Sequence, residues 1–491
     1  MELLLIDGQW RPPAEGGSRT IVCPATGETV GEVAEATDTD TLAAIAAAHA
    51  AFADGAGLWP RAPMSERAAM LDRVADILQR DTPTIARAEA LDTGKRYLEA
   101  EYDLADVISV FRHYAALGAE LATEHAVDLD VVGVQSRTVK EPIGVCALIT
   151  PWNYPLLQAS WKVAPCLLAG NTFVLKPSEI TPHSTIALMK ALVEAGMPPG
   201  VGNLVLGTGA GCGAPLSSDP RVALVSFTGS LAVGRHLMAA AAPTVKRVAL
   251  ELGGKNPNIV FADADYEAAL DNALTAVFLH SGQVCSAGAR LLVEQPLAER
   301  FVEDLVSRAH AIRPGLPFDE AAQTGSLTSA AHLRKVEDYV AAGIAEGARL
   351  RVGGARPTDP ALANGFYYLP TVFDQCSSGM HIVQEESFGP VLTVETFTTE
   401  AEAVALANDS IYGLAGAVWT SDEARAERVA RALRMGTVWI NDYHPYVAQA
   451  EWGGYKQSGI GRELGSLGLE EYQETKHIWR NTAPAPSGWF A

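Results

Sequence analysis

The distribution of apolar and polar residues along the chain predicts an α/β protein built on parallel sheets. Between residues 143 and 261, short and almost wholly apolar runs alternate with longer stretches of helical character. The apolar runs are typical of strands buried on both faces, and the longer stretches are typical of helices that cover a sheet. Strands are expected at 143–150, 172–175, 203–206, 224–227, 248–251 and 258–261, and helices at about 155–168, 182–195 and 230–242.

The same α/β style extends to both sides of this region. Further helices are expected at about 39–53, from 65 onward, at 97–121, 265–279, 296–311, 329–346 and 422–434, with strands at 290–293, 392–397 and 437–440. Residues 126–142 alternate between apolar and polar side chains instead, which predicts an exposed ribbon that tends to pair with another chain. The tail, 472–491, contains two prolines and is expected to be peripheral.

Composition places the chain among ordinary folded proteins. It has 491 residues, 48 % hydrophobic and 19 % charged, which is enough for about two or three domains with sizeable cores. The net charge of −21 argues against nucleic-acid binding, because phosphate backbones are bound by basic surfaces. An acidic surface attracts cationic small molecules, but it mainly serves solubility.

The first residues and the cysteines indicate in which cellular compartment the protein is expected. Residues 1–7 hold a run of four apolar side chains, at 3–6, without a basic segment, which does not fit a signal peptide. No run approaches the ~18 apolar residues of a membrane helix. The six cysteines are scattered, with neither a CxxC pair nor the Cys/His spacing of a zinc site. We therefore expect reduced thiols, a cytoplasmic protein, no membrane contact and no metal among these side chains.

A thiol and a carboxylate are the leading candidates for chemistry. Cys285 lies in His-Ser-Gly-Gln-Val-Cys-Ser-Ala, 34 residues after Glu251, which opens Glu-Leu-Gly-Gly-Lys. Small neighbours let a substrate approach the backbone, so the two side chains suggest a nucleophile and its base. The alternative is that Cys285 is a buried apolar side chain and Glu251 a solvated one.

An amide provides a third candidate. Asn153 lies in Thr-Pro-Trp-Asn-Tyr-Pro, where an expected strand ends and a helix begins at Pro155. Its side chain either caps that helix or points its N–H groups at a developing oxyanion, a contribution of roughly 2.7–4 kcal/mol in enzymes that use such a donor.

Several loops at strand ends suggest a dinucleotide site. They are Leu-Lys-Pro-Ser-Glu at 175–179, a glycine-rich loop at 207–213, and Phe-Thr-Gly-Ser at 227–230, which opens a helix. Carboxyl ends of parallel strands meet at one edge of a sheet, where ligands bind, and a helix N-terminus suits a phosphate. Glu386 and Phe388, ahead of a Gly-Pro turn, add a carboxylate and a ring for a second ribose and the nicotinamide. Each stretch taken alone is equally typical of a plain loop or turn.

Taken in order, six motifs resemble those of the aldehyde dehydrogenase superfamily over nearly the whole chain: Pro-Trp-Asn, Lys-Pro-Ser-Glu, Phe-Thr-Gly-Ser, Glu-Leu-Gly-Gly-Lys, Gly-Gln-x-Cys and Glu-x-Phe-Gly-Pro. The resemblance implies a Rossmann-like, parallel-sheet NAD-binding domain, an α/β catalytic domain, and a small β oligomerisation flap with a C-terminal tail. The matching ranges are 1–123 with 143–252, 253–452, and 124–142 with 453–491. It also implies a homodimer or homotetramer, and some relatives hold potassium at backbone carbonyls.

The resemblance assigns roles as well. Cys285 is the nucleophile that forms a thiohemiacetal and then a thioester, Glu251 is the general base, and Asn153 with the Cys285 N–H forms the oxyanion hole. Lys162 matches a lysine described as a proton relay. Glu179 favours NAD over NADP, because a carboxylate repels the 2′-phosphate. The implied cofactor contacts are Trp152, Lys176, Ser178, Glu179, Gly209, Gly213, Phe227, Gly229, Ser230, Val233, Leu252, Glu386 and Phe388.

Aromatic residues indicate the aldehyde. Tyr154 and Trp161 are seven residues apart, two helical turns, and therefore share a face. With Trp452 they could cage a quaternary ammonium, although core packing is the alternative. This set and the stretch 452–465 resemble betaine aldehyde dehydrogenases, which oxidise betaine aldehyde to the osmoprotectant glycine betaine. Leu279 departs from the pattern, because plant members can carry another Trp there.

Two other functions stay open at this stage. Asp103 and Asp106 match acidic positions that face a primary amine in related aminoaldehyde dehydrogenases, so an ω-aminoaldehyde such as 4-aminobutyraldehyde is the alternative substrate. Some members of the superfamily are catalytically silent structural proteins such as lens crystallins. A silent chain need not keep nucleophile, base and oxyanion donor together, and this chain has all three.

Overall fold

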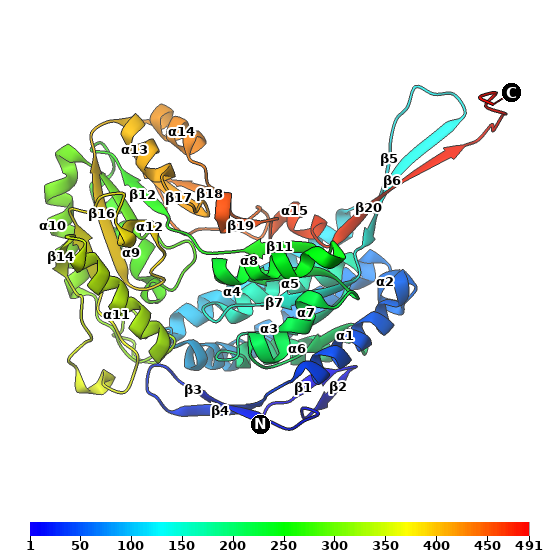
Figure 1. Ribbon diagram of the computed structural model, residues 1–491, viewed down its shortest axis with the longest axis horizontal. Coiled ribbons are helices and arrows are strands. Elements are labelled where there is room, and N and C mark those ends of the chain that lie inside the picture. The colour runs from blue at the N-terminus through cyan, green and yellow to red at the C-terminus, as the bar shows by residue number, and fades with distance from the viewer. Residues whose placement is uncertain (491) are drawn as a thin grey trace.

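The computed structural model describes residues 1–490 and contains two large sheets and a projecting arm (Figure 1). The first sheet has eight strands. Across the sheet they are β19 (Gly459–Ile460), β11 (Arg247–Glu251), β10 (Val222–Thr228), β7 (Val145–Ile149), β8 (Thr172–Lys176), β9 (Gly202–Leu204), β1 (Leu4–Ile6) and β2 (Gln9–Arg11). The five strands from β11 to β9 are parallel to their neighbours, and β19, β1 and β2 join antiparallel at the edges.

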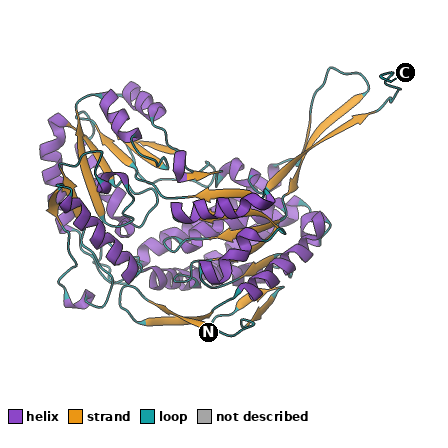
Figure 2. Ribbon diagram, in the orientation of Figure 1, coloured by secondary structure: helices purple, strands orange, loops and turns teal. Residues whose placement is uncertain are grey.

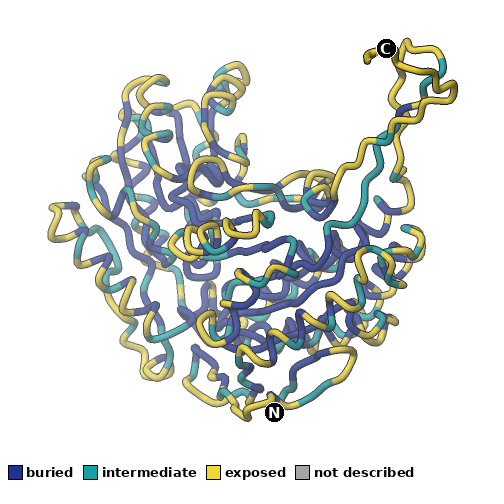
Figure 3. Tube along the Cα trace, turned by 45° about the vertical axis from the view of Figure 1, so that its right-hand side comes forward, coloured by how far each residue is buried: buried dark blue, intermediate teal, exposed yellow. Residues whose placement is uncertain are grey.

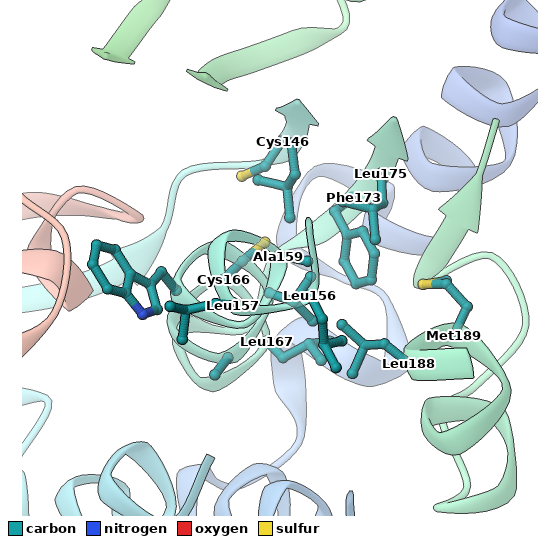
Figure 4. Close-up of a cluster of buried hydrophobic side chains, with 14 of the residues drawn as sticks. Cys146, Leu156, Leu157, Ala159, Cys166, Leu167, Phe173, Leu175, Leu188 and Met189 are labelled. Carbon is teal, nitrogen blue, oxygen red and sulfur yellow. The ribbon is translucent and has the colours of Figure 1, made fainter. Parts of the chain in front are cut away.

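Helices cover both faces of this sheet, as its apolar strands require (Figure 2). They are α1 (Asp38–Phe52), α3 (Met64–Thr93), α4 (Tyr97–Glu120), α5 (Pro155–Ala169), α6 (His183–Glu194), α7 (Ala214–Ser218) and α8 (Leu231–Ala241). Helix α5 is buried at every residue, because it lies between the sheet and helices α3 and α4. Its Leu156, Ala159 and Leu167 join a core with Phe173 of β8 and Leu188 of α6 (Figure 4).

The second sheet has seven strands. Across it they are β14 (Arg349–Val352), β15 (Thr371–Asp374), β16 (Val391–Phe397), β13 (Arg290–Glu294), β12 (Pro257–Val260), β17 (Ala415–Trp419) and β18 (Thr437–Ile440), all parallel except β14. Its helices are α9 (Tyr266–Phe278), α10 (Gln295–Ala311), α11 (Ala330–Ala345), α12 (His381–Gln384), α13 (Glu400–Asn408) and α14 (Glu423–Ala432). The second sheet has hydrophobic clusters of its own, although Ala415 and Ala417 of β17 and Trp439 of β18 belong to the core of the first sheet. The tube in Figure 3 shows buried chain in both bodies.

The expected α/β class is confirmed. Every strand and helix predicted between residues 143 and 261 is present, with ends that differ by no more than two residues. Strands β14, β15 and β17 and helix α13 were not predicted. These elements are only four to nine residues long, too short for a reliable period.

A three-stranded arm leaves the first body, and the C-terminus lies beside its tip (Figure 1). Strand β6 (Val134–Pro142) pairs with β5 (Glu124–Ala126) on one side and with β20 (Gln473–Asn481) along its whole length on the other. The expected ribbon is therefore present, although residues 127–133 form its loop. Residues 473–481 of the tail form β20, a strand that was not predicted, because its mostly exposed polar side chains hide its backbone pairing.

Other residues after 452 belong to the first body. Strand β19 pairs with β11, and α15 (Gly465–Glu470) packs against α5. Near the N-terminus, β3 (Ser18–Val22) and β4 (Thr29–Ala34) form a separate hairpin. The domain boundaries drawn from the sequence remain a prediction.

One stretch, Asp38–Arg61, is long and apolar enough to count as a candidate membrane span, which the sequence analysis did not anticipate. It consists of α1, a short 3-10 turn and α2 (Leu58–Arg61). Left-handed backbone at Ala53 and Asp54 (φ 49° and 53°) interrupts it. Helix α1 packs on β8 and β9, so this stretch is part of the first body.

Candidate active site

Cys285 lies in a tightly anchored loop between α9 and β13. Just before it, His280, Ser281 and Gly282 all have left-handed backbone, with φ of 47°, 54° and 73°. Such a run is costly for residues other than glycine and persists only where the surroundings hold it. The Ser281 hydroxyl donates to the Gly325 carbonyl at 2.6 Å, and the His280 N–H donates to Glu99 Oε1 at 3.1 Å. Gly282 is required, because a Cβ there would lie 2.1 Å from the Gly389 carbonyl oxygen.

Two cavities meet at Cys285. A groove of about 230 Å³ lies on one side of the loop, and a cavity of about 400 Å³ lies on the other. Among the described residues that line them, Cys285 alone is common to both. Its side chain is half-buried. The sulfur of Cys285 therefore lies where a ligand in the groove and a ligand in the cavity would come into contact.

Glu251 ends strand β11 and lines the groove close to Cys285. Burial raises the pKa of its carboxyl group well above the ordinary value, and the neighbouring Glu463 raises it further. Glu463 accepts a hydrogen bond from the Lys162 ammonium in a buried ion pair. The structure thus places Lys162 behind the base, through Glu463. Glu463 was missed by sequence reasoning, because 301 residues separate the pair.

The thiol of Cys285 is held in its protonated form. Burial raises its pKa to about 12, and the carboxylates of Glu251 and Glu386 raise it in the same direction. A nucleophilic thiolate at neutral pH must therefore arise by transfer of the proton to a base when a ligand is bound. Glu251 and Glu386 both line the groove, and of the two Glu251 has the larger effect on the pKa of the thiol.

Asn153 lies in the loop between β7 and α5 and lines the same groove. Its Nδ2 donates one hydrogen bond to the Gln283 carbonyl at 2.8 Å, which fixes the amide against the Cys285 loop. A side-chain amide has two N–H donors, so one remains for an oxygen in the groove. Helix capping, the alternative role, is not seen: the residue at the start of α5 is Tyr154, without a side-chain cap bond.

Three rings form the wall of the groove. The centroid of Trp152 lies 5.2 Å from that of Phe388 and 5.1 Å from that of His332. Phe388 has left-handed backbone (φ 56°), and its carbonyl accepts a 2.7 Å hydrogen bond from His332 Nε2. Burial lowers the pKa of His332 to about 4, so the ring is neutral at neutral pH and carries its proton on Nε2. His332 was not predicted; nothing in the sequence around it signals this role.

The groove continues into an open trough of about 820 Å³. Ser230, Lys335 and Glu386 line both parts. Glu386 Oε1 accepts from the Gly254 N–H at 3.0 Å. A Cβ on Gly253 would lie 2.2 Å from Glu386 Oε2, so the paired glycines make room for this carboxylate. Lys335, on α11, is a groove cation that sequence reasoning missed.

The predicted cofactor residues fall into two places. The groove and trough bring together Trp152, Gly229, Ser230, Leu252, Glu386 and Phe388. Phe227 and Val233 adjoin it, since a Cβ on Gly229 would meet the Phe227 ring at 2.4 Å and the Ser230 hydroxyl accepts from the Val233 N–H to cap α8. The remaining residues, Lys176, Ser178, Glu179, Gly209 and Gly213, lie at the ends of β8 and β9 and do not line these cavities.

This second place is nevertheless built in a way that suits a ligand. Lys176 Nζ lies 3.8 Å from Glu179 Oε2, and Gly213 lies against the Lys176 side chain. A Cβ on Gly209 would meet nothing within 4 Å, so space is open beside the loop. A cation, a carboxylate and free space therefore share the carboxyl edge of the first sheet.

The cavity on the other side of Cys285 contains every predicted substrate residue: Tyr154, Trp161, Trp452, Asp103 and Asp106. Trp161, Trp452 and Tyr446 contact one another, with ring centroids 5.3–6.1 Å apart. Leu279, where plant relatives can carry Trp, lines the cavity too. The residues missed are Glu99, Tyr102, Leu157, Val284, Ser286, Tyr443, His444, Pro445 and Tyr446. The cluster of aromatic residues at 443–446 was a visible signal that we did not use.

Among residues 1–490, no three His, Cys, Asp or Glu side chains gather as metal ligands. The chemistry available here is that of a thiol, a buried carboxylate and an amide donor, placed between a groove and an aromatic cavity. This arrangement on two α/β bodies defines a class of enzyme in which a cysteine forms a covalent bond with one ligand beside the binding groove of another.

Comparison with known proteins identifies the family within that class. The chain belongs to the aldehyde dehydrogenase family, whose model matches residues 10–478. The betaine aldehyde dehydrogenase of Bacillus subtilis (strain 168) is 54 % identical over 489 residues, covering 100 % of this chain and 99 % of that protein. The aminoaldehyde dehydrogenase 2 of Zea mays is 44 % identical over 491 residues, covering 99 % and 97 %.

Solved structures agree. A crystal structure of betaine aldehyde dehydrogenase from Staphylococcus aureus in complex with NAD+ matches with a TM-score of 0.98 and 48 % identity, covering 100 % of this chain and 97 % of that one. The family resemblance and the fold inferred from the sequence are therefore confirmed.

Proposed function

We propose that the protein is an NAD-dependent aldehyde dehydrogenase that oxidises betaine aldehyde to glycine betaine. The observation that carries this proposal is that Cys285 lines both the groove and the aromatic cavity. An aldehyde in the cavity and a cofactor in the groove would meet at its sulfur. The similarity to betaine aldehyde dehydrogenases, one of them in complex with NAD+, supports both assignments.

The residues present fit NAD. The N-terminus of α8, capped by Ser230, and the cations Arg235 and Lys335 would hold phosphates, because free N–H groups and positive charge favour an anion. Glu386 would accept from a ribose, and the rings beside Phe388 would flank the nicotinamide. Lys176 and Glu179 would hold the other ribose, and this carboxylate disfavours NADP. NAD held there would supply a hydride acceptor beside the carbon attached to Cys285.

Side chains of the protein carry out the remaining steps of the reaction. Glu251 in its ionised form takes the proton from the Cys285 thiol, and the sulfur attacks the carbonyl carbon. Asn153 donates its remaining N–H to the oxygen that becomes negative. After oxidation the carbon is a thioester. Glu251 first gives up the proton that it took from the thiol and then takes a proton from water, whose oxygen attacks the thioester carbon. The C–S bond breaks, the acid leaves, and Cys285 is returned as a thiolate. Lys162, through Glu463, lies behind Glu251 and passes its proton onward.

The cavity supports a quaternary ammonium substrate. Trimethylammonium has no N–H to donate, so it is held by aromatic faces and by diffuse negative charge. Tyr154, Trp161, Tyr446 and Trp452 supply the faces. Three carboxylates in the same lining supply the charge.

An ω-aminoaldehyde is the alternative substrate. Asp106, on the cavity wall, would accept from a primary ammonium, and plant relatives named aminoaldehyde dehydrogenases are 41–44 % identical. A structural, silent role is the remote alternative.

The decisive experiment follows NADH absorbance with the purified protein and three substrates: betaine aldehyde, 4-aminobutyraldehyde and propanal. We expect the highest kcat/KM with betaine aldehyde. Cys285→Ala should abolish NADH production while NAD binding, followed by fluorescence titration, is retained. Turnover near the wild-type rate in that variant would refute the mechanism, and a higher kcat/KM for 4-aminobutyraldehyde would select the alternative.

We further infer that the protein forms a homodimer or homotetramer in the cytoplasm. The arm exposes Val131, Val132 and Trp479, and exposed strands with apolar side chains tend to pair with another chain. All six cysteines are unpaired, which fits a reducing compartment.

A further inference from the structure

A buried lysine stands behind the wall of the aromatic cavity. Lys95 lies between α3 and α4, and its side chain is fully buried. Its Nζ lies 2.5 Å from Asp103 Oδ2 and 3.6 Å from Glu89 Oε1. The same ammonium lies 4.1 Å from the centroid of the Tyr154 ring. Lys95 therefore contacts two residues that line the cavity, Asp103 and Tyr154, from the side away from it.

The other aspartate of this wall has a different environment. Asp106 is three residues further along α4 and shares the face of Asp103. The Tyr446 hydroxyl donates to its Oδ2 at 2.6 Å, and no lysine or arginine of residues 1–490 lies within 4.0 Å of its carboxylate. Tyr446 is neutral, so Asp106 keeps its negative charge available to the cavity. Asp103 and Asp106 look alike in the sequence, but in the structure only Asp103 forms an ion pair with a lysine.

We propose that Lys95 is a specificity-determining residue, which holds Asp103 in an internal ion pair and leaves Asp106 as the aspartate that meets the cationic end of the substrate. This inference rests on the proposed function. A primary ammonium, which needs several hydrogen-bond acceptors, then finds fewer of them. A trimethylammonium group makes no hydrogen bonds, so it loses only part of the diffuse negative charge and is affected less. Lys95 also fixes the Tyr154 ring that such a group contacts.

The two aspartates provide the test. Asp103→Asn and Asp106→Asn are compared through kcat/KM for 4-aminobutyraldehyde, each divided by kcat/KM for propanal. We expect Asp106→Asn to lower this ratio by about tenfold or more, since a hydrogen-bonded ion pair with the substrate is lost, and Asp103→Asn to lower it less than about threefold. Equal losses, or a larger loss for Asp103→Asn, would overturn the proposal.

A lysine variant tests the same idea from the other side. Lys95→Met frees Asp103, so the preference for betaine aldehyde over 4-aminobutyraldehyde should fall by about tenfold, while Lys95→Arg should keep it. Lys190→Met, at an exposed lysine paired with Glu2, is the matched control. An unchanged preference in folded Lys95→Met refutes the proposal. If that variant does not fold, the double variant Lys95→Met/Asp103→Asn, which removes both charges, should show the preference of Asp103→Asn.

The proposed function and the role of Lys95 are refuted by different results. Wild-type protein that yields no NADH with any of the three aldehydes contradicts the proposed function. Normal turnover together with equal effects of the two aspartate variants contradicts only the role of Lys95.

Discussion

Burial sets the protonation of individual residues in this site. Cys285 and Glu251 both have pKa values raised chiefly by burial, so burial favours the neutral form of each group. Attack on an aldehyde requires one proton to leave the pair. The same low-polarity surroundings strengthen the interactions of the charges that form during reaction.

Activity should therefore rise with pH. Below its pKa of about 12 the thiolate fraction of Cys285 grows tenfold per pH unit, so the rate of alkylation by iodoacetamide should rise about tenfold per pH unit between pH 7 and 9. Because the Glu251 carboxylate raises the pKa of the thiol, Glu251→Gln should speed alkylation at a given pH, even though it slows turnover. Cys285→Ser is the control for labelling elsewhere. A pH-independent rate would contradict this account.

The aromatic cavity yields a second prediction at this scale. Trp452→Ala removes one ring from the set that contacts Trp161 and Tyr446. Loss of a cation–π contact of roughly 0.5–2 kcal/mol should raise KM for betaine aldehyde about 2- to 30-fold more than KM for propanal. Steady-state kinetics with both substrates decide the matter. Equal increases would mean that Trp452 serves only packing.

Glu89 links a single residue to stability. Burial raises its pKa to about 7 from an ordinary value of 4.5. Its contribution to the free energy of unfolding is fully present below pH 4.5 and is lost as the pH rises through 7, by up to about 3 kcal/mol. Urea unfolding at pH 5 and pH 8 should therefore show a smaller decrease for Glu89→Gln than for the wild type. Glu28→Gln, at an exposed position, should match the wild type; an equal decrease in all three would refute the prediction.

Among the elements, α5 connects the core to the site. Tyr154, just before its first residue, and Trp161, two turns further on, face the aromatic cavity, and its buried C-terminal end needs partners for free carbonyl groups. The Arg67 guanidinium supplies them, donating to the Leu168 carbonyl at 2.8 Å and to the Ala62 carbonyl at 2.6 Å. Arg67 thus joins α3 to the ends of α5 and α2.

Arg67→Met should lower the free energy of unfolding by about 2–5 kcal/mol, because buried carbonyls lose charged donors. Arg61→Met, at an exposed arginine in α2, should change it by less than about 0.5 kcal/mol. Urea midpoints of the two variants measure the difference. KM for betaine aldehyde should stay within about twofold, since Arg67 lies at the far end of α5. A large change in KM with an unchanged midpoint would contradict the assignment.

At the scale of the whole molecule, the two bodies and the arm have separate tasks. The groove is lined by residues from both bodies, such as Glu251 of β11 in the first and Lys335 of α11 in the second. Neither body alone therefore forms the groove. The arm stands clear of both bodies (Figure 1). Its three strands leave backbone edges and apolar side chains exposed.

The arm should control assembly. Replacing Val132 and Trp479 by Asp places charge on an apolar exposed ribbon, and we expect the double variant to shift from dimer or tetramer toward monomer in light scattering. Glu470→Gln, near the base of the arm, should leave the mass unchanged. A wild-type monomer, or a variant that keeps its assembly, would contradict the role of the arm.

The sequence by itself determined the local features. Apolar runs and helical spacing predicted the strands and helices between β7 and β12, because short strands buried on both faces are almost wholly apolar and the longer stretches between them have helical character. The motifs around Cys285, Glu251 and Asn153 were legible because each is contiguous, and all three residues line one groove. The tail strand β20 was missed, since its pairing is made by backbone rather than by apolar side chains.

Only the tertiary structure decided which residues become partners. Lys162 forms an ion pair with Glu463, 301 residues away in the sequence. Lys95 forms an ion pair with Asp103 and not with Asp106. Contacts of this kind depend on how whole elements pack, and charged side chains a turn apart look alike in sequence. The position of Cys285 between two cavities is likewise a product of packing, because each cavity is lined by elements that are distant along the chain.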